Sequence, residues 1–402
     1  MQELDAKLQQ ITKLKSGVKR LTLTDFRNYK NLRLETDIVP IIITGENGSG
    51  KTNILEALSF LAPGRGLRSA RLSEIKRIHN ITDTNILAAD TWSVAAEILK
   101  NDEEHTIGTA LTRLSRENLS DDGDDEIHTY ERRIVKIDQQ KVSQQSELGK
   151  YISAIWITPQ MDRLFSGGPQ PRRSFLDRLV YAFDLEHAKR TANYEHLYRQ
   201  WYQLLKSGCN DHHWLKSIES DMAGLGVAIA AARREQIARL NTFIAAEPDD
   251  IFPDVQLELA GTIEKMLDTL PAIKVEDFYA DNLLKQRRAV VQNESTDGIN
   301  RTDFKVYFKK KNMPAELCST GEQKALLVSI ILAQTKCQIL DKGFAPVLLL
   351  DEVTTHLDDV KRDALLHKIK DLHLQAWITS TEPQNFAVLR ESAQFIETAS
   401  LA

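Results

Sequence analysis

The chain has 402 residues, of which 42% are hydrophobic and 27% charged, and its 52 lysines and arginines face 57 acidic residues for a net charge of −5. This length predicts two or three domains with a large buried core. The negative balance excludes a uniformly basic coat, and any nucleic acid would have to be bound by local basic patches. The three cysteines form no C-x-x-C pair and no apolar run approaches the ~18 residues of a membrane span. We therefore expect a cytoplasmic protein in a reducing compartment.

Strands and one helix are predicted in the first part of the chain. Residues 18–34 alternate apolar and polar side chains around a polar-aromatic turn, which predicts two strands. A β-branched run at 38–43 predicts a buried strand, and apolar residues at helical spacing from Ile54 to Ala62 predict a helix that Pro63 ends. Short strands and turns are expected over about 83–157.

A helical pattern then runs from Arg172 to about Ala246, and three prolines break the segment that follows: Pro248, Pro253 and Pro271. Strand-like alternation returns at 304–308, and a long apolar helix is expected over 325–340. The last hundred residues therefore look like a return to the first domain.

The turn between the buried strand and the first helix carries a G-x-x-x-x-G-K-[ST] motif. Backbone N–H groups of such a loop turn inward around phosphate, and the helix N-terminus adds positive potential. Lys51 is expected to reach the β- and γ-phosphates and Thr52 to ligate Mg²⁺. An ordinary glycine-rich turn is the alternative, which the flanking strand and helix disfavour. The motif predicts a phosphate loop made of Gly45, Glu46, Asn47, Gly48, Ser49, Gly50, Lys51 and Thr52.

A second nucleotide signal is the apolar strand 347–350, which ends in Asp351 and Glu352. The carboxyl ends of strands in open α/β sheets are where ligands bind. Asp351 is expected to hold Mg²⁺ through water, and Glu352 is the candidate general base that orients and deprotonates an attacking water. A strand that ends in two acids is common by itself. The presence of a phosphate loop in the same chain favours a nucleotide-binding role for this strand.

Ser319-Thr320-Gly321 opens the long apolar helix and is a second turn suited to an anion. A simple helix cap by Ser319 or Thr320 is the alternative. Two phosphate-facing turns in one chain suggest that one serves its own nucleotide and the other a partner's.

Together these motifs resemble those of the SMC-like branch of ABC-type ATPases, and more closely those of the RecF family of bacterial recombination and gap-repair ATPases. The resemblance covers nearly the whole chain from Val18. It includes further segments at Phe26–Tyr29, Gly64–Ser69, Thr158–Pro169, Arg172–Asp177, Leu357–Asp358 and Ala376–Thr381. It implies an α/β fold, an ABC-type P-loop ATPase head with an inserted, mainly helical second domain. The implied parts are an N-terminal extension at 1–17 that adds a short helix, ATPase parts at 18–165 and 290–402, and a helical arm at 166–289.

The resemblance also implies a mechanism in which two chains sandwich ATP and Mg²⁺. Ser319 of one chain would meet the γ-phosphate held by Lys51 of the other, and hydrolysis through Glu352 would release the pair. The activity implied is a weak, DNA-stimulated ATPase used as a switch. Further implied nucleotide contacts are Arg27, Asn28, Gln160 and Gly321.

Two positions depart from the family pattern. Gln160 stands where the family commonly has Glu, and Asn300 stands where it often has His. The roles carried over to these positions are correspondingly weaker.

The implied ligand is duplex DNA at the edge of a single-stranded gap, bound without sequence preference, with RecO and RecR as partners and RecA loading and the SOS response as the outcome. Basic clusters that could contact its phosphates lie at 132–136, 172–178, 287–288 and 309–311. Each cluster alone is more typical of a solvated face.

Other functions stay open as alternatives. A transporter ATPase subunit shares the nucleotide motifs but usually has a much shorter span between Lys51 and Asp351. An SMC protein needs a long coiled coil at the insertion, which the three prolines exclude. An ATPase fused to a nuclease domain lacks room after Glu352, and a binding module without turnover is the remaining alternative.

Overall fold

The computed structural model describes residues 2–77, 91–117, 127–246 and 249–401. The chain divides into two compact units, the first made of residues 1–159 and 338–402 and the second of residues 160–337. The sequence predicted the domain limits elsewhere, at 165/166 and 289/290. Those limits remain predictions. Pro248 lies outside the described residues.

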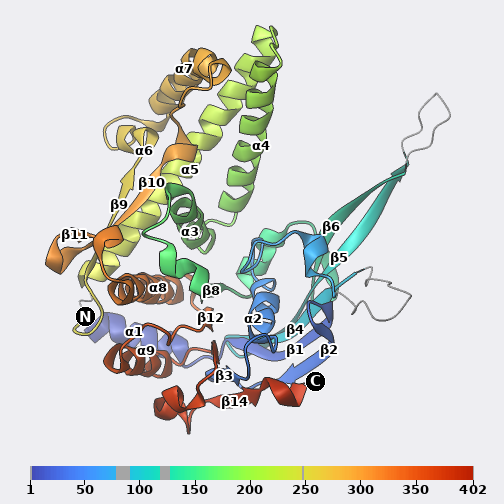
Figure 1. Ribbon diagram of the computed structural model, residues 1–402, viewed down its shortest axis with the longest axis vertical. Coiled ribbons are helices and arrows are strands. Elements are labelled where there is room, and N and C mark those ends of the chain that lie inside the picture. The colour runs from blue at the N-terminus through green and yellow to red at the C-terminus, as the bar shows by residue number, and fades with distance from the viewer. Residues whose placement is uncertain (1, 78–90, 118–126, 247–248, 402) are drawn as a thin grey trace. The chain divides into compact units, whose positions relative to one another are not determined.

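The first unit begins with helix α1 (Gln2–Thr12), as expected for the N-terminal extension, and continues into a six-stranded antiparallel sheet. The sheet has the order β2-β1-β4-β5-β6-β7, with β1 (Gly17–Phe26), β2 (Tyr29–Glu35), β4 (Ser93–Lys100), β5 (Glu103–Glu117), β6 (Ile127–Ile137) and β7 (Gln140–Val142). Strands β1 and β2 confirm the two predicted at 18–34. The prediction of short strands over 83–157 was wrong for β5 and β6, which form a long hairpin of 15 and 11 residues (Figure 1).

A second sheet of the first unit is parallel and has the order β14-β3-β13-β12-β8. Its strands are β3 (Ile41–Thr44), β8 (Ala154–Ile157), β12 (Val347–Asp351), β13 (Ala376–Ser380) and β14 (Gln394–Glu397). Every residue of β12 and β13 is buried, as expected for a parallel strand that is covered on both faces. The carboxyl ends of β3, β12 and β13 therefore meet at one edge of the sheet.

Helices α2 (Lys51–Ser59) and α9 (Asp359–Asp371) follow β3 and β12 along the chain. Helix α2 ends earlier than predicted, since the N–H groups of Phe60 and Leu61 bond to carbonyls only three residues before them. The Ser59 hydroxyl accepts the backbone N–H of Leu67 at 2.7 Å. The following segment thus folds back over the helix end. Short 3-10 turns of this unit are η1 (Leu72–Ile75), η2 (Gln145–Lys150), η7 (Pro383–Leu389) and η8 (Thr398–Leu401).

The second unit consists mainly of helices, with α4 and α5 packed along each other (Figure 1). Its helices are α3 (Pro169–Tyr181), α4 (His187–Lys206), α5 (His212–Ala246), α6 (Thr262–Met266) and α7 (Ala272–Val291), and a small sheet has the order β11 (Met313–Pro314), β10 (Asp303–Phe308), β9 (Val255–Ala260). Helix α8 (Thr320–Lys342) starts before the predicted 325, directly after Ser319. The 3-10 turns of the second unit are η4 (Ile299–Arg301), η5 (Lys309–Lys311) and η6 (Ala315–Leu317), and η3 (Pro159–Arg163) begins one residue before it. Among the described residues, no helix is long and apolar enough to cross a bilayer.

A buried ion pair joins the helices of the second unit. The Arg233 guanidinium of α5 donates to both carboxylate oxygens of Asp177 on α3, each at 2.8 Å. His187 of α4 contacts the same carboxylate through Nε2 at 2.8 Å. A buried charge is tolerated only when it is paired and hydrogen-bonded, so these contacts specify how the three helices pack.

Candidate nucleotide-binding site

The phosphate loop, residues Gly45–Thr52, connects β3 to α2. Gly45 and Gly50 have φ angles of +150° and +100°, which side chains rarely permit. Space is also limiting, because a Cβ on Gly45 would lie 1.9 Å from Thr398 Oγ1 and a Cβ on Gly50 would lie 2.4 Å from Asn28 Nδ2. Glycine is thus required at both positions by conformation and by packing.

Lys51 is the first residue of α2 and is 5% exposed. Its ammonium donates to the carbonyl oxygens of Gly45 at 2.7 Å and Glu46 at 2.8 Å, so the side chain folds back over the loop. Ser49 is held from the other end of the chain, since its Oγ accepts from Thr398 Oγ1 at 2.8 Å. Contacts within the protein therefore hold the loop and its lysine in place.

Thr52 and Asp351 come together at the edge of the parallel sheet. Thr52 Oγ1 lies 3.0 and 3.1 Å from the two carboxylate oxygens of Asp351, the last residue of β12. Hydroxyl and carboxylate oxygens are ligands that Mg²⁺ prefers, and it usually keeps several waters beside one or two of them. The pair fits the predicted Mg²⁺ site.

Glu352 follows Asp351 in a left-handed conformation, with φ +49°. Its backbone N–H donates to Thr379 Oγ1 at 3.0 Å. The chain turns sharply here, and the two acids stand at the carboxyl end of a parallel strand, as the sequence predicts.

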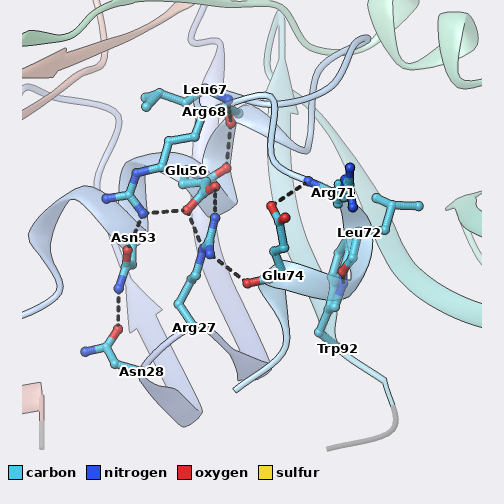
Figure 2. A network of polar contacts seen from close by, with 11 residues as sticks. Arg27, Asn28, Asn53, Glu56, Leu67, Arg68, Arg71, Leu72, Glu74 and Trp92 are labelled. Atoms are coloured by element: carbon cyan, nitrogen blue, oxygen red, sulfur yellow. Dashed lines mark hydrogen bonds and ion pairs between the residues drawn. The ribbon is translucent and has the colours of Figure 1, made fainter. Parts of the chain in front are cut away.

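Arg27 takes part in a network around a buried carboxylate, drawn in Figure 2. Its guanidinium donates to both oxygens of Glu56, at 2.8 and 2.6 Å, and to the carbonyl of Glu74 at 2.7 Å. Arg68 Nη1 donates to the same Glu56 carboxylate at 3.0 Å. The observed partners of Arg27 are thus in the protein, and its contact to nucleotide stays a prediction.

Asn28 lies beside the last glycine of the phosphate loop and is exposed. Its Oδ1 accepts from Asn53 Nδ2 at 2.7 Å, and Asn53 in turn accepts from Arg68 at 2.9 Å (Figure 2). The predicted role of Asn28 as a nucleotide contact is compatible with this place, although nothing yet tests it.

The signature turn, residues Ser319–Gln323, lies in the second unit. The Ser319 backbone N–H donates to Glu322 Oε2 at 2.9 Å and the Glu322 backbone N–H donates to Ser319 Oγ at 3.4 Å, which forms a capping box at the start of α8. Lys311 pairs with Glu322, and these contacts lower the pKa of the Glu322 carboxyl to about 2. Ser319 and Gln160 are exposed and Gly321 is half-buried, so a second molecule can reach them.

One predicted basic cluster divides between the two faces of a strand. Arg133 is 6% exposed and donates to Thr109 Oγ1 at 2.7 Å and to the Phe60 carbonyl, and burial lowers the pKa of its guanidinium to about 9. Arg132 and Lys136 alternate with it along β6 and are exposed. Arg133 is therefore structural, and only its neighbours face solvent.

The other predicted clusters are partly structural as well. Burial lowers the pKa of Arg178 to about 9, and its half-buried guanidinium lies 3.5 Å from Met161 Sδ. Four more of these cations are paired with acids: Arg172 with Asp303, Arg287 with Glu219, Lys309 with Asp254 and Lys311 with Glu322.

Three residues shape the site although the sequence analysis assigned them no role: Glu56, Thr379 and Thr398. Glu56 has a signal in the sequence, since an acid within the apolar helix 54–62 needs a cationic partner when it is buried. Thr379 lies in the segment 376–381, which belongs to the family resemblance, but its contacts come from tertiary structure alone, as do those of Thr398.

The chain is similar to known proteins over nearly its whole length. The family model for the RecF/RecN/SMC N terminal domain matches residues 17–399. The chain is 40% identical over 384 residues to the DNA replication and repair protein RecF of Allorhizobium ampelinum, covering 95% of the chain and 97% of the relative. It is 38% identical over 379 residues to the protein of the same name from Rickettsia felis, covering 94% and 96%.

Solved structures of the recombination mediator protein RecF, one with ATP and one with ATPrS, have the same fold. Their TM-scores are 0.74 and 0.75 at 20% and 19% identity, and each covers 92% of this chain and 93% or 94% of its own. Fold and site together define an ABC-type ATPase head of the kind shared by RecF and SMC proteins. The chain belongs to the RecF family of DNA replication and repair proteins. This membership leaves the transporter-subunit alternative without support.

Proposed function

We propose that the chain is an ATP-dependent dimerising switch of recombinational repair that binds gapped duplex DNA. The observation that carries this proposal is the contact at 3.0 Å between Thr52 of the phosphate loop and Asp351 of β12, with Glu352 beside it. A phosphate cradle, a pair of metal ligands and a candidate base thus share one sheet edge. The family membership supplies the DNA and the repair context.

The chemistry follows from these side chains. Backbone N–H groups of the phosphate loop and the ammonium of Lys51 bind the β- and γ-phosphates. Thr52, and Asp351 through water, would hold Mg²⁺, which when bound would neutralise the negative charge of the phosphates. Glu352 orients the attacking water and accepts its proton.

The second chain completes the site. Ser319 and Gly321 stand at the N-terminus of the 23-residue helix α8, where the helix dipole favours an anion. In the dimer they bind the γ-phosphate that is held by Lys51 of the other copy. Gln160 is a further proposed contact to γ-phosphate. ADP lacks that group, so ATP stabilises the dimer and hydrolysis releases it.

DNA is bound through its backbone, with Arg132 and Lys136 of β6 as exposed cations that could meet phosphates. RecO and RecR are the proposed protein partners, and RecA loading and the SOS response the proposed outcome. The two solved RecF structures are described as recombination mediators of the RecFOR pathway, which supports this assignment.

ATP hydrolysis with and without gapped duplex DNA tests the function. We expect gapped DNA to stimulate hydrolysis, and Glu352→Gln to lower it by about 100-fold or more while ATP still binds. Glu35→Gln, at an exposed carboxylate on β2, is the matched control. Unchanged turnover in Glu352→Gln, or no effect of DNA on the wild type, would defeat the proposal.

A further inference from the structure

Thr379 contacts both acids at the end of β12. It lies on the neighbouring parallel strand β13, in register with Asp351, and its side chain is fully buried. Its Oγ1 donates to Asp351 Oδ1 at 2.7 Å and accepts the backbone N–H of Glu352 at 3.0 Å. One hydroxyl therefore connects the metal-holding carboxylate to the backbone of the candidate base.

The direction of these two hydrogen bonds is determined by chemistry. A backbone N–H can only donate, so the single hydroxyl hydrogen of Thr379 is left for Asp351. Asp351 Oδ1 also accepts from Thr52 Oγ1 at 3.0 Å, and thus two hydroxyls from different elements orient the same carboxylate oxygen. Groups behind a metal ligand commonly tune its affinity in this way.

The second hydrogen bond acts on Glu352. A left-handed backbone is strained for a residue with a side chain, and Glu352 has φ +49°. The bond from its N–H to Thr379 keeps the chain in this turn. The direction in which Glu352 leaves the sheet is therefore coupled to the orientation of Asp351.

We infer that Thr379 is a positioning residue that holds Asp351 and Glu352 in one relative geometry, so that metal binding and proton transfer are set up together. This inference rests on the proposed function, because it assumes that the two acids serve Mg²⁺ and the attacking water. Thr379 itself is buried behind them and acts only through them.

Substitutions of Thr379, compared with a control substitution elsewhere, separate a positioning role from simple packing. Thr379→Val keeps the shape of the side chain and removes both hydrogen bonds, whereas Thr379→Ser keeps the hydroxyl. Thr36→Val is the matched control, since Thr36 is a buried threonine of the same unit whose Oγ1 donates to the Val18 carbonyl at 2.6 Å. Thr379→Cys, with a weaker donor, serves if the valine variant does not fold.

The readouts are ATP affinity in Mg²⁺ and in EDTA, the turnover number and the melting temperature. In Thr379→Val we expect the Mg²⁺-dependent gain in ATP affinity and the turnover number each to fall about tenfold or more. Hydrogen bonds to a charged group contribute at that level. ATP affinity in EDTA should stay as in the wild type. Thr379→Ser should have the Mg²⁺-dependent gain and the turnover number of the wild type, and Thr379→Cys should have values between those of the serine and valine variants. Thr36→Val should change only the melting temperature.

A Thr379→Val protein with the Mg²⁺ gain and turnover of the wild type would overturn the inference. So would a loss of ATP affinity that is equal in Mg²⁺ and in EDTA, or a Thr379→Ser protein as impaired as the valine variant, since each indicates a packing role. Failure of the proposed function looks different: the wild type itself would show no Mg²⁺-dependent hydrolysis, and Glu352→Gln would change nothing.

Discussion

Arg27 holds the carboxylate of Glu56 through two hydrogen bonds of 2.8 and 2.6 Å, and the Glu56 side chain is only 1% exposed. Arg27 lies in the turn between β1 and β2, and Glu56 lies on α2, the helix that begins with Lys51. The pair therefore connects the first hairpin to the helix that carries the phosphate-binding lysine. Arg68 adds a third charge from the segment after α2.

Removal of this carboxylate should destabilise the protein strongly. Glu56→Ala leaves Arg27 without its buried partner, and a broken buried pair costs about 3–5 kcal/mol of the free energy of unfolding. Urea denaturation measures this change. Glu35→Ala is the control, since Glu35 pairs with Arg20 and Arg33 at the surface and its loss should change stability little. Equal effects of the two substitutions would contradict the role given to the Arg27–Glu56 pair.

Acid should weaken the second unit through Asp177. Burial alone would raise the pKa of Asp177, but Arg233 and His187 outweigh it and lower the pKa to about 2 from the ordinary 3.8. A lowered pKa gives stability that is complete above pH 3.8 and is lost as the pH falls toward 2, about 2 kcal/mol in all.

Asp177→Asn tests this expectation by urea denaturation between pH 7 and pH 2.5. The variant should be less stable at neutral pH, because Arg233 loses its charged partner, and the gap to the wild type should narrow below about pH 4. Asp359→Asn removes an exposed carboxylate and is the control. A gap that stays constant over the whole pH range would refute the assignment.

Two glycines of the phosphate loop should respond differently to alanine. A Cβ on Gly45 would collide with Thr398 Oγ1, whereas a Cβ on Gly48 meets nothing within 4 Å, although both residues have positive φ. Gly45→Ala should therefore abolish ATP binding, and Gly48→Ala should weaken it less, by the cost of backbone strain alone. Titration with a fluorescent ATP analogue ranks the two, and the reverse order would be inconsistent with this geometry.

DNA binding should depend on the exposed face of β6. The double variant Arg132→Ala with Lys136→Ala should lower the affinity for gapped duplex and reduce the slope of log K against log salt by about two. Lys13→Ala with Lys15→Ala removes two exposed cations of the same unit and should leave that slope unchanged. Fluorescence anisotropy over a salt series measures both. An unaltered slope in the first variant would exclude this face.

Much of the nucleotide site could be predicted from the sequence, since its residues occupy turns at strand ends with a fixed spacing. Thr52 and Asp351 were expected to share a metal, and the structure brings them within 3.1 Å. The contact was predictable because the carboxyl ends of parallel strands in one sheet lie at the same edge, although β13 lies between β3 and β12.

Other features depend on contacts that no local pattern reveals. Thr379 and Thr398 reach the site from strands and turns with unremarkable composition, so their partners emerge only once the chain has folded. The separation of Arg132 from Arg133 follows from the alternation of side chains along a strand, but β6 had been expected to be short.

Light scattering of the Glu352→Gln protein tests the central claim, that ATP joins two copies through the Lys51 loop of one and the Ser319 turn of the other. With ATP and Mg²⁺ the particle should have twice the mass of one chain, and with ADP the mass of a single chain. The additional substitution Ser319→Arg, on the exposed turn, should abolish the ATP-dependent dimer. The same mass in ATP and in ADP would contradict the account.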